Sequence, residues 1–343
     1  MGGEMKCCAN CIGDRGLRIE IIPMFSTETG VCSYCFTKDE RLVKPSHLRN
    51  YFELLVNIYR RNEHGKTLVE WFKDDWDMFA HPTMDIVHSA ELLADILDDG
   101  QIVHENFSPS DLCQSDRLDR WEKLRSELMY ENRFFPKTEI DESRLSGLLS
   151  HLLLRSDDVL VNWYRARIQR SEVSYPANEM GAPPKRLASQ GRANPAGIPY
   201  LYLASNPRTA ISEIRPHTGD MASVADFTIS QDLKIVDLRH PRSTVSPFIL
   251  YDENEIALLR GDIGFLKHLG DELTRPVLPQ VAAIDYIPSQ YLCEFIKKCG
   301  YHGVMYKSSV GDGENLALFV PNLAQIGNVT QYRVSRVSVE LEG

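Results

Sequence analysis

Hydrophobic and polar residues alternate with two different periodicities along this chain, and the periodicity changes near residue 150. From Ser46 to about residue 150, apolar residues recur every three or four positions, which is typical of one face of a helix. Ser46 can cap the first helix and Gly65 can end it. The stretch is therefore expected to be an all-α helical bundle, with apolar stripes at 48–59, 86–97, 118–128 and 145–153.

Beyond about residue 155, short runs of β-forming residues are separated by Pro, Gly and Asn. Helices are predicted between some of these runs, and the helix at 207–214 has Asn206 as its N-cap and Pro207 in its first turn. Strands and helices do not alternate regularly enough for a doubly wound parallel sheet, so a mixed α+β domain is expected. The predicted strands are 199–204, 224–229, 233–238, 303–307, 315–319 and 332–341, and the other helices are 253–259, 264–273 and 289–299.

Charge and composition narrow the classes of protein. The 343 residues include 38 Lys+Arg and 48 Asp+Glu, a net charge of −10, which argues against general binding of nucleic acid or anionic membranes. Most of the excess acidity lies between residues 46 and 150. No stretch approaches the length of an apolar membrane span, and the first residues lack the apolar core of a secretory signal. We therefore expect a cytoplasmic protein.

Five of the eight cysteines lie within the first 35 residues. Cys8 and Cys11 form one C-x-x-C pair, Cys32 and Cys35 form a second, and this arrangement is typical of a four-thiolate zinc site. Cys7 is an alternative ligand to Cys8. With four thiolates no coordination position is left for chemistry, so Zn²⁺ is expected to be structural. Three domains follow: a zinc-knuckle module at 1–45, an acidic helical bundle at 46–150 and a mixed domain at 151–343.

Several familiar catalytic motifs are missing from the mixed domain. The sequence has no G-x-G-x-x-G, no G-x-x-x-x-G-K-[ST] and no H-E-x-x-H, and no G-x-S-x-G surrounds Ser308. The Gly311-Asp312-Gly313 run is expected to be a hairpin turn rather than a phosphate loop. A bound nucleotide would need another kind of site.

The polar residues of 191–216 point to such a site. Arg192 and Asn194 lie in a loop bounded by glycines, where an arginine can bind phosphate oxygens with its planar fork. Tyr200 and Tyr202 share one strand face, where either ring can stack on a base. Glu213 follows near the end of the helix at 207–214, between apolar neighbours, where a carboxylate needs a partner or a function.

These residues resemble the RES domain family, whose characterised members include toxins of bacterial toxin–antitoxin pairs. The resemblance covers about residues 155 to 325, and the amino-terminal part is similar to the zinc-knuckle and helical extension of some RES domains. It rests on Trp163-Tyr164-Arg165-Ala166-Arg167, on GRANPAGIPYLYLASNPRTAISEIRP from Gly191, on Gly303-Val304-Met305-Tyr306-Lys307-Ser308-Ser309 and on Asn315-Leu316-Ala317-Leu318-Phe319.

The resemblance implies a fold similar to that of ADP-ribosyltransferases and cleavage of the nicotinamide–ribose bond of NAD⁺, which is a substrate here. Arg167 competes with Arg165 for the first arginine of the family, and Ser309 competes with Ser308 for its serine. The implied catalytic residues are Arg165, Arg192, Tyr202, Glu213 and Ser308, and further substrate contacts are expected from Arg167, Asn194, Tyr200 and Ser309.

Three functions remain open at this point. The first is an NAD⁺ glycohydrolase or phosphorylase that acts as a toxin or defence effector and is restrained by an antitoxin or another regulatory protein. The second is an ADP-ribosyltransferase that modifies a macromolecule. The third is a binding module that holds a nucleotide without turning it over.

Overall fold

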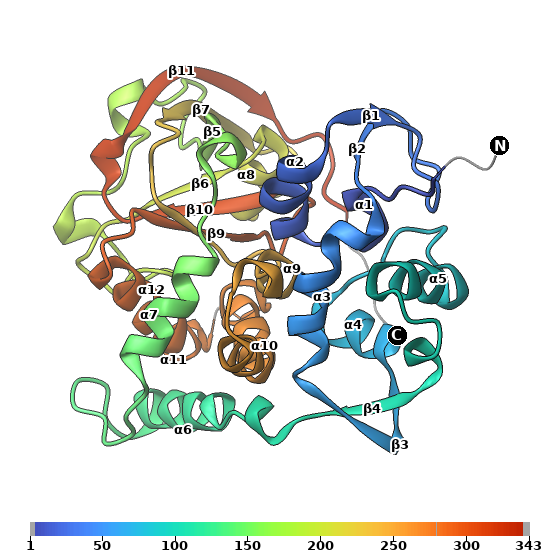
Figure 1. The fold of residues 1–343 in the computed structure, drawn as a ribbon. Coiled ribbons are helices and arrows are strands. Elements are labelled where there is room, and N and C mark those ends of the chain that lie inside the picture. Colours follow the sequence, from blue (N-terminus) through green and yellow to red (C-terminus); the bar gives the residue numbers. More distant parts are fainter. Residues whose placement is uncertain (1–3, 279, 339–343) are drawn as a thin grey trace. The chain divides into compact units, whose positions relative to one another are not determined.

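The structure is a computed structural model that describes residues 4–278 and 280–338. The chain forms two compact units, one from Met1–Leu118 and Arg242–Lys267, the other from Asp119–Pro241 and His268–Gly343. The helices are α1 (Ala9–Ile12), α2 (Ile22–Phe25), α3 (Arg49–Val56), α4 (Leu68–Trp76), α5 (Ile86–Leu97), α6 (Arg117–Tyr130), α7 (Glu142–His151), α8 (Pro207–Glu213), α9 (Pro241–Thr244), α10 (Glu253–Thr274), α11 (Ala282–Asp285) and α12 (Ile287–Lys298) (Figure 1).

The second unit contains a seven-stranded sheet in the order β11-β7-β5-β6-β10-β9-β8 (Figure 1). Neighbouring strands are antiparallel except for the parallel pair β8 and β9. The mixed α+β prediction is confirmed. The strands are β1 (Glu28–Gly30), β2 (Glu40–Leu42), β3 (Tyr59–Thr67), β4 (Asn106–Pro109), β5 (Asn162–Ile168), β6 (Leu201–Ala204), β7 (Met221–Ile229), β8 (Ile235–Asp237), β9 (Gly303–Lys307), β10 (Glu314–Leu318) and β11 (Ala324–Arg333).

Strand alternation divides the side chains of this sheet between two faces. One face carries the larger apolar core, which includes Trp163, Leu203 and Leu316. The other face carries Ala166 and Ala204, against which α8 packs with Ala210. The small residues on that face leave room for α8, and this places the carboxyl end of α8 near the ends of β9 and β10.

The expectation of an all-α bundle over 46–150 is wrong in one part. The helix predicted to continue to Gly65 ends at Val56, and Tyr59–Thr67 forms β3, which pairs antiparallel with β4. Gly65 lies within β3 and does not end a helix. A Cβ at this position would lie 1.9 Å from the carbonyl oxygen of Phe107 on β4. This close approach of two backbones is what requires glycine.

The other predicted helices of this stretch are present as α5, α6 and α7. Helix α4 was not predicted, although Thr67 and Glu70 form a capping box at its start. None of the helices in the described part of the chain has both the length and the apolar content needed to cross a bilayer.

Residues 242–267, which include most of α10, belong to the first unit, and α6 and α7 belong almost entirely to the second. The prediction of folding domains at 1–45, 46–150 and 151–343 concerns independent folding and stays a prediction. Helices predicted at 253–259 and 264–273 are one continuous helix, α10. The strand predicted at 332–341 is instead β11, which ends at Arg333, and residues 339–341 of that prediction lie outside the described residues.

Candidate functional site

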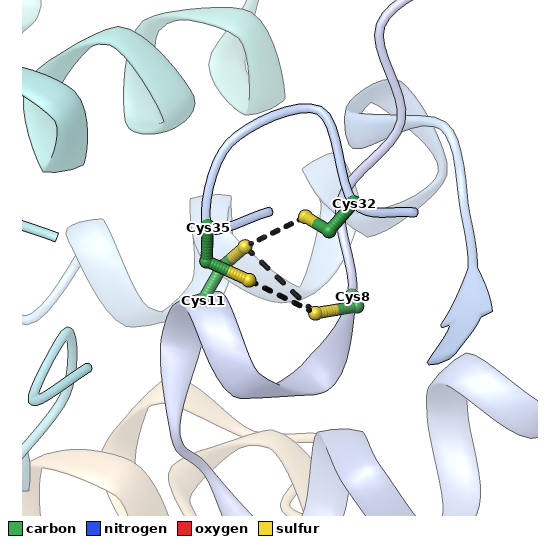
Figure 2. A group of neighbouring side chains, drawn as sticks. All are labelled: Cys8, Cys11, Cys32 and Cys35. Atoms are coloured by element: carbon green, nitrogen blue, oxygen red, sulfur yellow. Dashed lines mark hydrogen bonds between the residues drawn. The ribbon is translucent and has the colours of Figure 1, made fainter. Parts of the chain in front are cut away.

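The two C-x-x-C pairs meet in the first unit. Their four sulfur atoms lie within 4.8 Å of one another, and all four residues are buried. Figure 2 shows the Sγ atoms turned toward a common centre, with Cys8–Cys35 at 3.5 Å, Cys11–Cys32 at 3.2 Å and Cys8–Cys11 at 4.0 Å. The Cys7 Sγ instead lies 3.6 Å from the Val43 carbonyl oxygen. The structure therefore selects Cys8 over Cys7 as the fourth member of the cluster.

This four-cysteine cluster fits a metal ion in geometry and chemistry. In a tetrahedral site with Zn–S bonds of about 2.3 Å, neighbouring sulfurs lie about 3.8 Å apart, close to the separations seen here. Hydrogen bonds from Cys11 and then Cys8 lower the pKa of the Cys32 thiol, which favours the thiolate that binds metals. The same contact with Cys32 raises the pKa of the Cys11 thiol, and the pKa of the Cys8 thiol is raised as well. The cluster can hold one metal ion.

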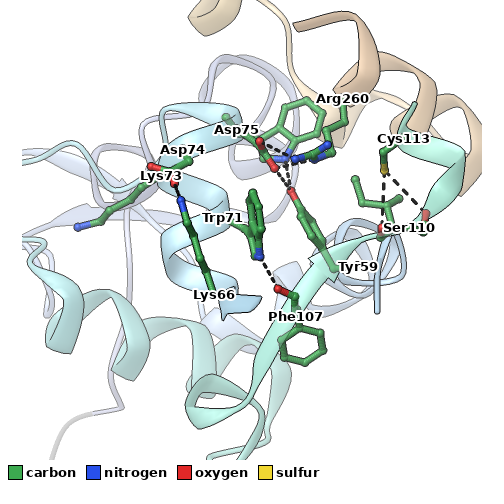
Figure 3. Close-up of polar contacts among 12 residues, drawn as sticks. Tyr59, Lys66, Trp71, Lys73, Asp74, Asp75, Phe107, Ser110, Cys113 and Arg260 are labelled. Atoms are coloured by element: carbon green, nitrogen blue, oxygen red, sulfur yellow. Dashed lines mark hydrogen bonds and ion pairs between the residues drawn. The ribbon is translucent and has the colours of Figure 1, made fainter. Parts of the chain in front are cut away.

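A second polar cluster of the first unit is saturated by its own contacts. Figure 3 shows that the Asp75 carboxylate accepts hydrogen bonds from the Tyr59 hydroxyl, at 2.8 Å, and from the Arg260 guanidinium, at 2.7 and 3.0 Å. Trp76 donates to the Tyr59 hydroxyl at 3.0 Å. Because each charge has a partner, this cluster ties β3 and α4 to α10 and has no group left for a ligand.

In the second unit, the large sheet opens between β5 and β6. Only one residue pair, Tyr164 and Ala204, joins the two strands. Beyond it, Arg165 fills the opening and donates from Nη1 to the Tyr202 carbonyl oxygen at 3.1 Å. The side chain thus satisfies a carbonyl that a continuous sheet would have paired with backbone.

Arg165 carries a positive charge without a carboxylate partner among the described residues. Its Nε is buried and has no hydrogen-bond acceptor there. Burial first, and the nearby Arg167 second, lower the pKa of the Arg165 guanidinium to about 10. A buried, uncompensated cation is costly, and an anionic ligand would compensate it.

Arg167 lies two residues along β5 but has other contacts. Its guanidinium donates to the Glu179 carbonyl oxygen and lies over the Tyr175 ring, 4.4 Å from the ring centroid. Of the two competing arginines, Arg165 is the one that the structure joins to Tyr202. A substrate contact for Arg167 stays a prediction.

The loop of Arg192 is held by helix α12. Ser289 and Gln290 donate to the carbonyl oxygens of Arg192 and Gly191, at 2.6 and 2.8 Å. The Arg192 guanidinium donates to the Arg275 carbonyl oxygen at 2.9 Å and lies 5.2 Å from the Tyr286 ring centroid. Within the described residues Arg192 forms no ion pair, so its charge is available to an anion.

Tyr202 joins this loop to the sheet. Its hydroxyl donates to the Asn194 Oδ1 at 2.7 Å and accepts from the Ala193 amide at 2.9 Å. A Cβ on Gly191 would lie 2.6 Å from both the Tyr202 hydroxyl and the Asn194 side-chain oxygen, so only glycine fits. Burial raises the pKa of Tyr202, which keeps its hydroxyl protonated as a donor.

Asn194 and Tyr200 have mainly internal contacts. The Asn194 amide nitrogen donates to three carbonyl oxygens of its own loop, those of Ser189, Pro195 and Ile198, at 2.9 to 3.0 Å. Tyr200 is buried and packs its ring against Phe319, with centroids 4.9 Å apart. These contacts shape the loop and the core, and substrate contacts for Asn194 and Tyr200 stay predictions.

Glu213 is the last residue of α8. Its carboxylate contacts residues at the carboxyl end of β9 and at the amino end of β10. Its Oε1 accepts from the Ser308 hydroxyl at 2.6 Å. Ser308 Oγ in turn accepts from the Val310 amide at 3.2 Å, which orients its proton toward Glu213. The exposed Ser309 has no such contact among the described residues. The structure therefore brings Ser308, rather than Ser309, to Glu213.

Two residues near Glu213 were not assigned a role from the sequence. Asn315, on β10, donates from Nδ2 to the same Glu213 Oε1 at 2.6 Å. Tyr306, on β9, is buried, and its pKa is raised well above the usual value by burial first and then by Tyr202 and Glu213, whereas Arg192 lowers it. Tyr306 thus lies within electrostatic reach of both Arg192 and Glu213. The signal that was available for Asn315 is an asparagine at the start of an otherwise apolar strand.

Comparisons with known proteins bear on the same region of the chain. The family model of the RES domain matches residues 162–336, slightly more than half of the chain. Among solved structures, the chain is similar to one in the crystal structure of the M. tuberculosis MbcT–MbcA toxin–antitoxin complex, with 15% identity and a TM-score of 0.31 over 55% of this chain and 93% of that one. No curated protein matches the chain. From the family match over residues 162–336, the chain belongs to the RES domain family.

Proposed function

We propose that this protein cleaves the nicotinamide–ribose bond of NAD⁺, as an NAD⁺ glycohydrolase or phosphorylase. The observation that carries the proposal is the hydrogen bond between Glu213 and Ser308, 95 residues apart along the chain, in a RES domain. Tyr306 lies within electrostatic reach of Glu213, Arg192 and Tyr202. Family membership supports NAD⁺ as the substrate. The buried charge of Arg165 and the charge of Arg192, neither of which has an acidic partner among the described residues, are each suited to a phosphate group.

Cleavage of the nicotinamide–ribose bond is favoured by a carboxylate close to the ribose. Nicotinamide leaves with the electron pair of the C1–N bond, so its ring becomes neutral while positive charge develops at ribose C1. The Glu213 carboxylate, fixed by Ser308, would stabilise that charge without having to reorganise. Water or phosphate then forms the new C–O bond to C1. When water is the acceptor, its surplus proton passes to Glu213 or to solvent, and the products are ADP-ribose and nicotinamide.

The test is product analysis with the full chain. Purified protein is incubated with NAD⁺, with and without inorganic phosphate, and the products are separated by chromatography. Release of nicotinamide with ADP-ribose identifies the hydrolase, and a phosphorylated ADP-ribose formed only with phosphate identifies the phosphorylase. Label from ADP-ribose-labelled NAD⁺ on protein or nucleic acid would identify a transferase instead, and retained NAD⁺ binding without turnover would overturn the proposal.

The four-cysteine cluster has a separate role in this proposal. We propose that it holds Zn²⁺ as a structural ion, because four thiolates fill a tetrahedral site completely. The surrounding segment has two short α-helices, a π-helical turn at Leu17–Ile21 and a two-stranded sheet, β1 and β2, and each of these elements is five residues or shorter. Metal binding would supply much of its folding energy.

The biological setting follows from the reaction. A cell that makes an NAD⁺-consuming enzyme needs to restrain it, so we propose a toxin or defence effector that is cytoplasmic and controlled by an inhibitory protein. Co-expression screening for a gene product that abolishes nicotinamide release by the purified chain would test this role. Full growth of cells that express the active chain alone would contradict it.

A further inference from the structure

Glu213 accepts two hydrogen bonds on one oxygen and none on the other from the described residues. Ser308 Oγ and Asn315 Nδ2 each lie 2.6 Å from Oε1. Two donors at one oxygen fix the plane of the carboxylate and leave Oε2 without a protein partner in that part of the chain. Oε2 is thus the oxygen that a ligand can meet.

Asn315 is placed by strand register. It pairs with Ala204 on β6 and with Tyr306 on β9, so it lies on the α8 face of a strand flanked on both sides. Its side chain is buried, with 6% of the residue exposed. Because strands β6 and β9 fix β10 from both sides, the Asn315 amide is held toward Glu213 by the sheet itself.

The chemistry of the asparagine amide determines how Asn315 can bind Glu213. An NH₂ group donates hydrogen bonds and cannot accept one, so Asn315 Nδ2 can only donate to the Glu213 carboxylate. Ser308 also donates to Oε1 of this carboxylate, while its own Oγ accepts from the Val310 amide. Both neighbours of Oε1 are therefore donors.

The other charged and titratable groups around Glu213 come from several elements. Arg215 follows it after α8, Tyr306 faces it from β9, and Arg192 acts on Tyr306 from its loop. Glu314, next to Asn315, forms an ion pair with Arg239, which also binds Asp237 at 2.8 Å. The negative charge of Glu314 is thereby compensated, and Asn315 remains the neutral donor on Glu213.

We infer that Asn315 is a positioning residue for NAD⁺ cleavage, which holds the Glu213 carboxylate in place through Oε1 so that Oε2 is presented to the ribose. This inference rests on the proposed function. It assigns a role to a residue that contacts the carboxylate rather than the substrate.

The test is the pH profile of nicotinamide release by the Asn315→Asp variant. The two side chains have nearly the same shape, so the fold is retained. At acidic pH the introduced carboxylic acid is protonated and still donates to Glu213. As the pH rises, the shared proton is lost, two carboxylates face each other and activity falls. Wild-type protein, with a neutral amide, keeps its activity over the same range.

Asn315→Ala gives a second measurement. Loss of a hydrogen bond to a charged group is expected to lower kcat about tenfold to a hundredfold, with a smaller change in KM. The matched control is Asn322→Asp, at an exposed position after β10, which should follow the wild-type profile. A wild-type pH profile in Asn315→Asp would overturn the inference, whereas absence of nicotinamide release by the wild-type chain would overturn the proposed function instead.

Discussion

The four-cysteine cluster and the Glu213 site are assembled in opposite ways. Cys8 and Cys35 are 27 residues apart, and two short turns bring all four sulfurs together. Glu213 meets Ser308 and Asn315 across 95 and 102 residues, through the register of a seven-stranded sheet. The four-cysteine cluster can therefore be predicted from the spacing of cysteines in a short motif. The hydrogen-bond partners of Glu213 depend on the sheet topology and cannot be predicted without the fold.

The largest loss of stability is expected from a substitution in the four-cysteine cluster. Cys32→Ser removes a thiolate from the cluster, and the chain should lose its bound zinc and the folding free energy that the metal supplies, which for structural zinc sites is on the order of 10 kcal/mol. Metal content by mass spectrometry and thermal unfolding measure both. Cys7→Ser is the matched control and should keep the metal, because Cys7 is directed to Val43. Zinc lost from Cys7→Ser and kept in Cys32→Ser would contradict the assignment.

A smaller loss of stability is expected at Asp14, because the first unit also has a contact between residues far apart in the sequence. Asp14 is buried, and its carboxylate accepts from the Leu17 amide at 2.9 Å and from Ser246, 232 residues away, at 2.7 Å. Burial raises its pKa from 3.8 to about 6. The folded chain thus keeps this proton to higher pH than the unfolded chain does, so the contribution of Asp14 to stability is fully present below about pH 4 and is lost as the pH rises through about 6.

The loss from this ionisation is up to about 3 kcal/mol. Asp14→Asn keeps an acceptor oxygen and removes the ionisation, so its melting temperature relative to wild type should rise between pH 4 and pH 7. Thermal unfolding of both proteins across that range is the measurement. A constant difference between the two proteins would show that Asp14 does not titrate there.

The stability and activity of the second unit are expected to be sensitive to one added methyl group in the loop of Gly191. Gly191→Ala places a Cβ 2.6 Å from the Tyr202 hydroxyl and the Asn194 oxygen. Overpacking of this kind costs about 1–3 kcal/mol, and nicotinamide release should fall because Arg192 is the next residue. Gly181→Ala is the control, since a Cβ there meets nothing within 4 Å. Equal stability and activity of the two variants would mean that the loop adapts freely.

The sequence predicted those features that local chemistry determines. The spacing of the cysteines identified four buried sulfurs that meet, and helical periodicity predicted α5. The hairpin between β9 and β10 was also predicted, from Gly311-Asp312-Gly313. In each case the residues that decide the structure are neighbours in the chain.

Long-range pairing explains the failures. Tyr59 continues the apolar stripe of α3, but it begins β3 because Pro109 on β4 pairs with it, a contact that periodicity does not contain. The role of Asn315 was missed for the same reason, since the register of three strands places its amide on Glu213. For α4 the sequence does contain a local signal, the capping box of Thr67 and Glu70.

The central claim is that the Glu213 carboxylate stabilises positive charge at the ribose of NAD⁺. The most direct measurement is the rate of nicotinamide release by Glu213→Gln, with Glu139→Gln, an exposed glutamate of the same unit, as the matched control. Because the glutamine keeps the shape and removes the charge, kcat should fall about 10²- to 10³-fold, the usual cost of losing one electrostatic stabiliser, while the control keeps the wild-type rate. A wild-type rate in Glu213→Gln would contradict the claim.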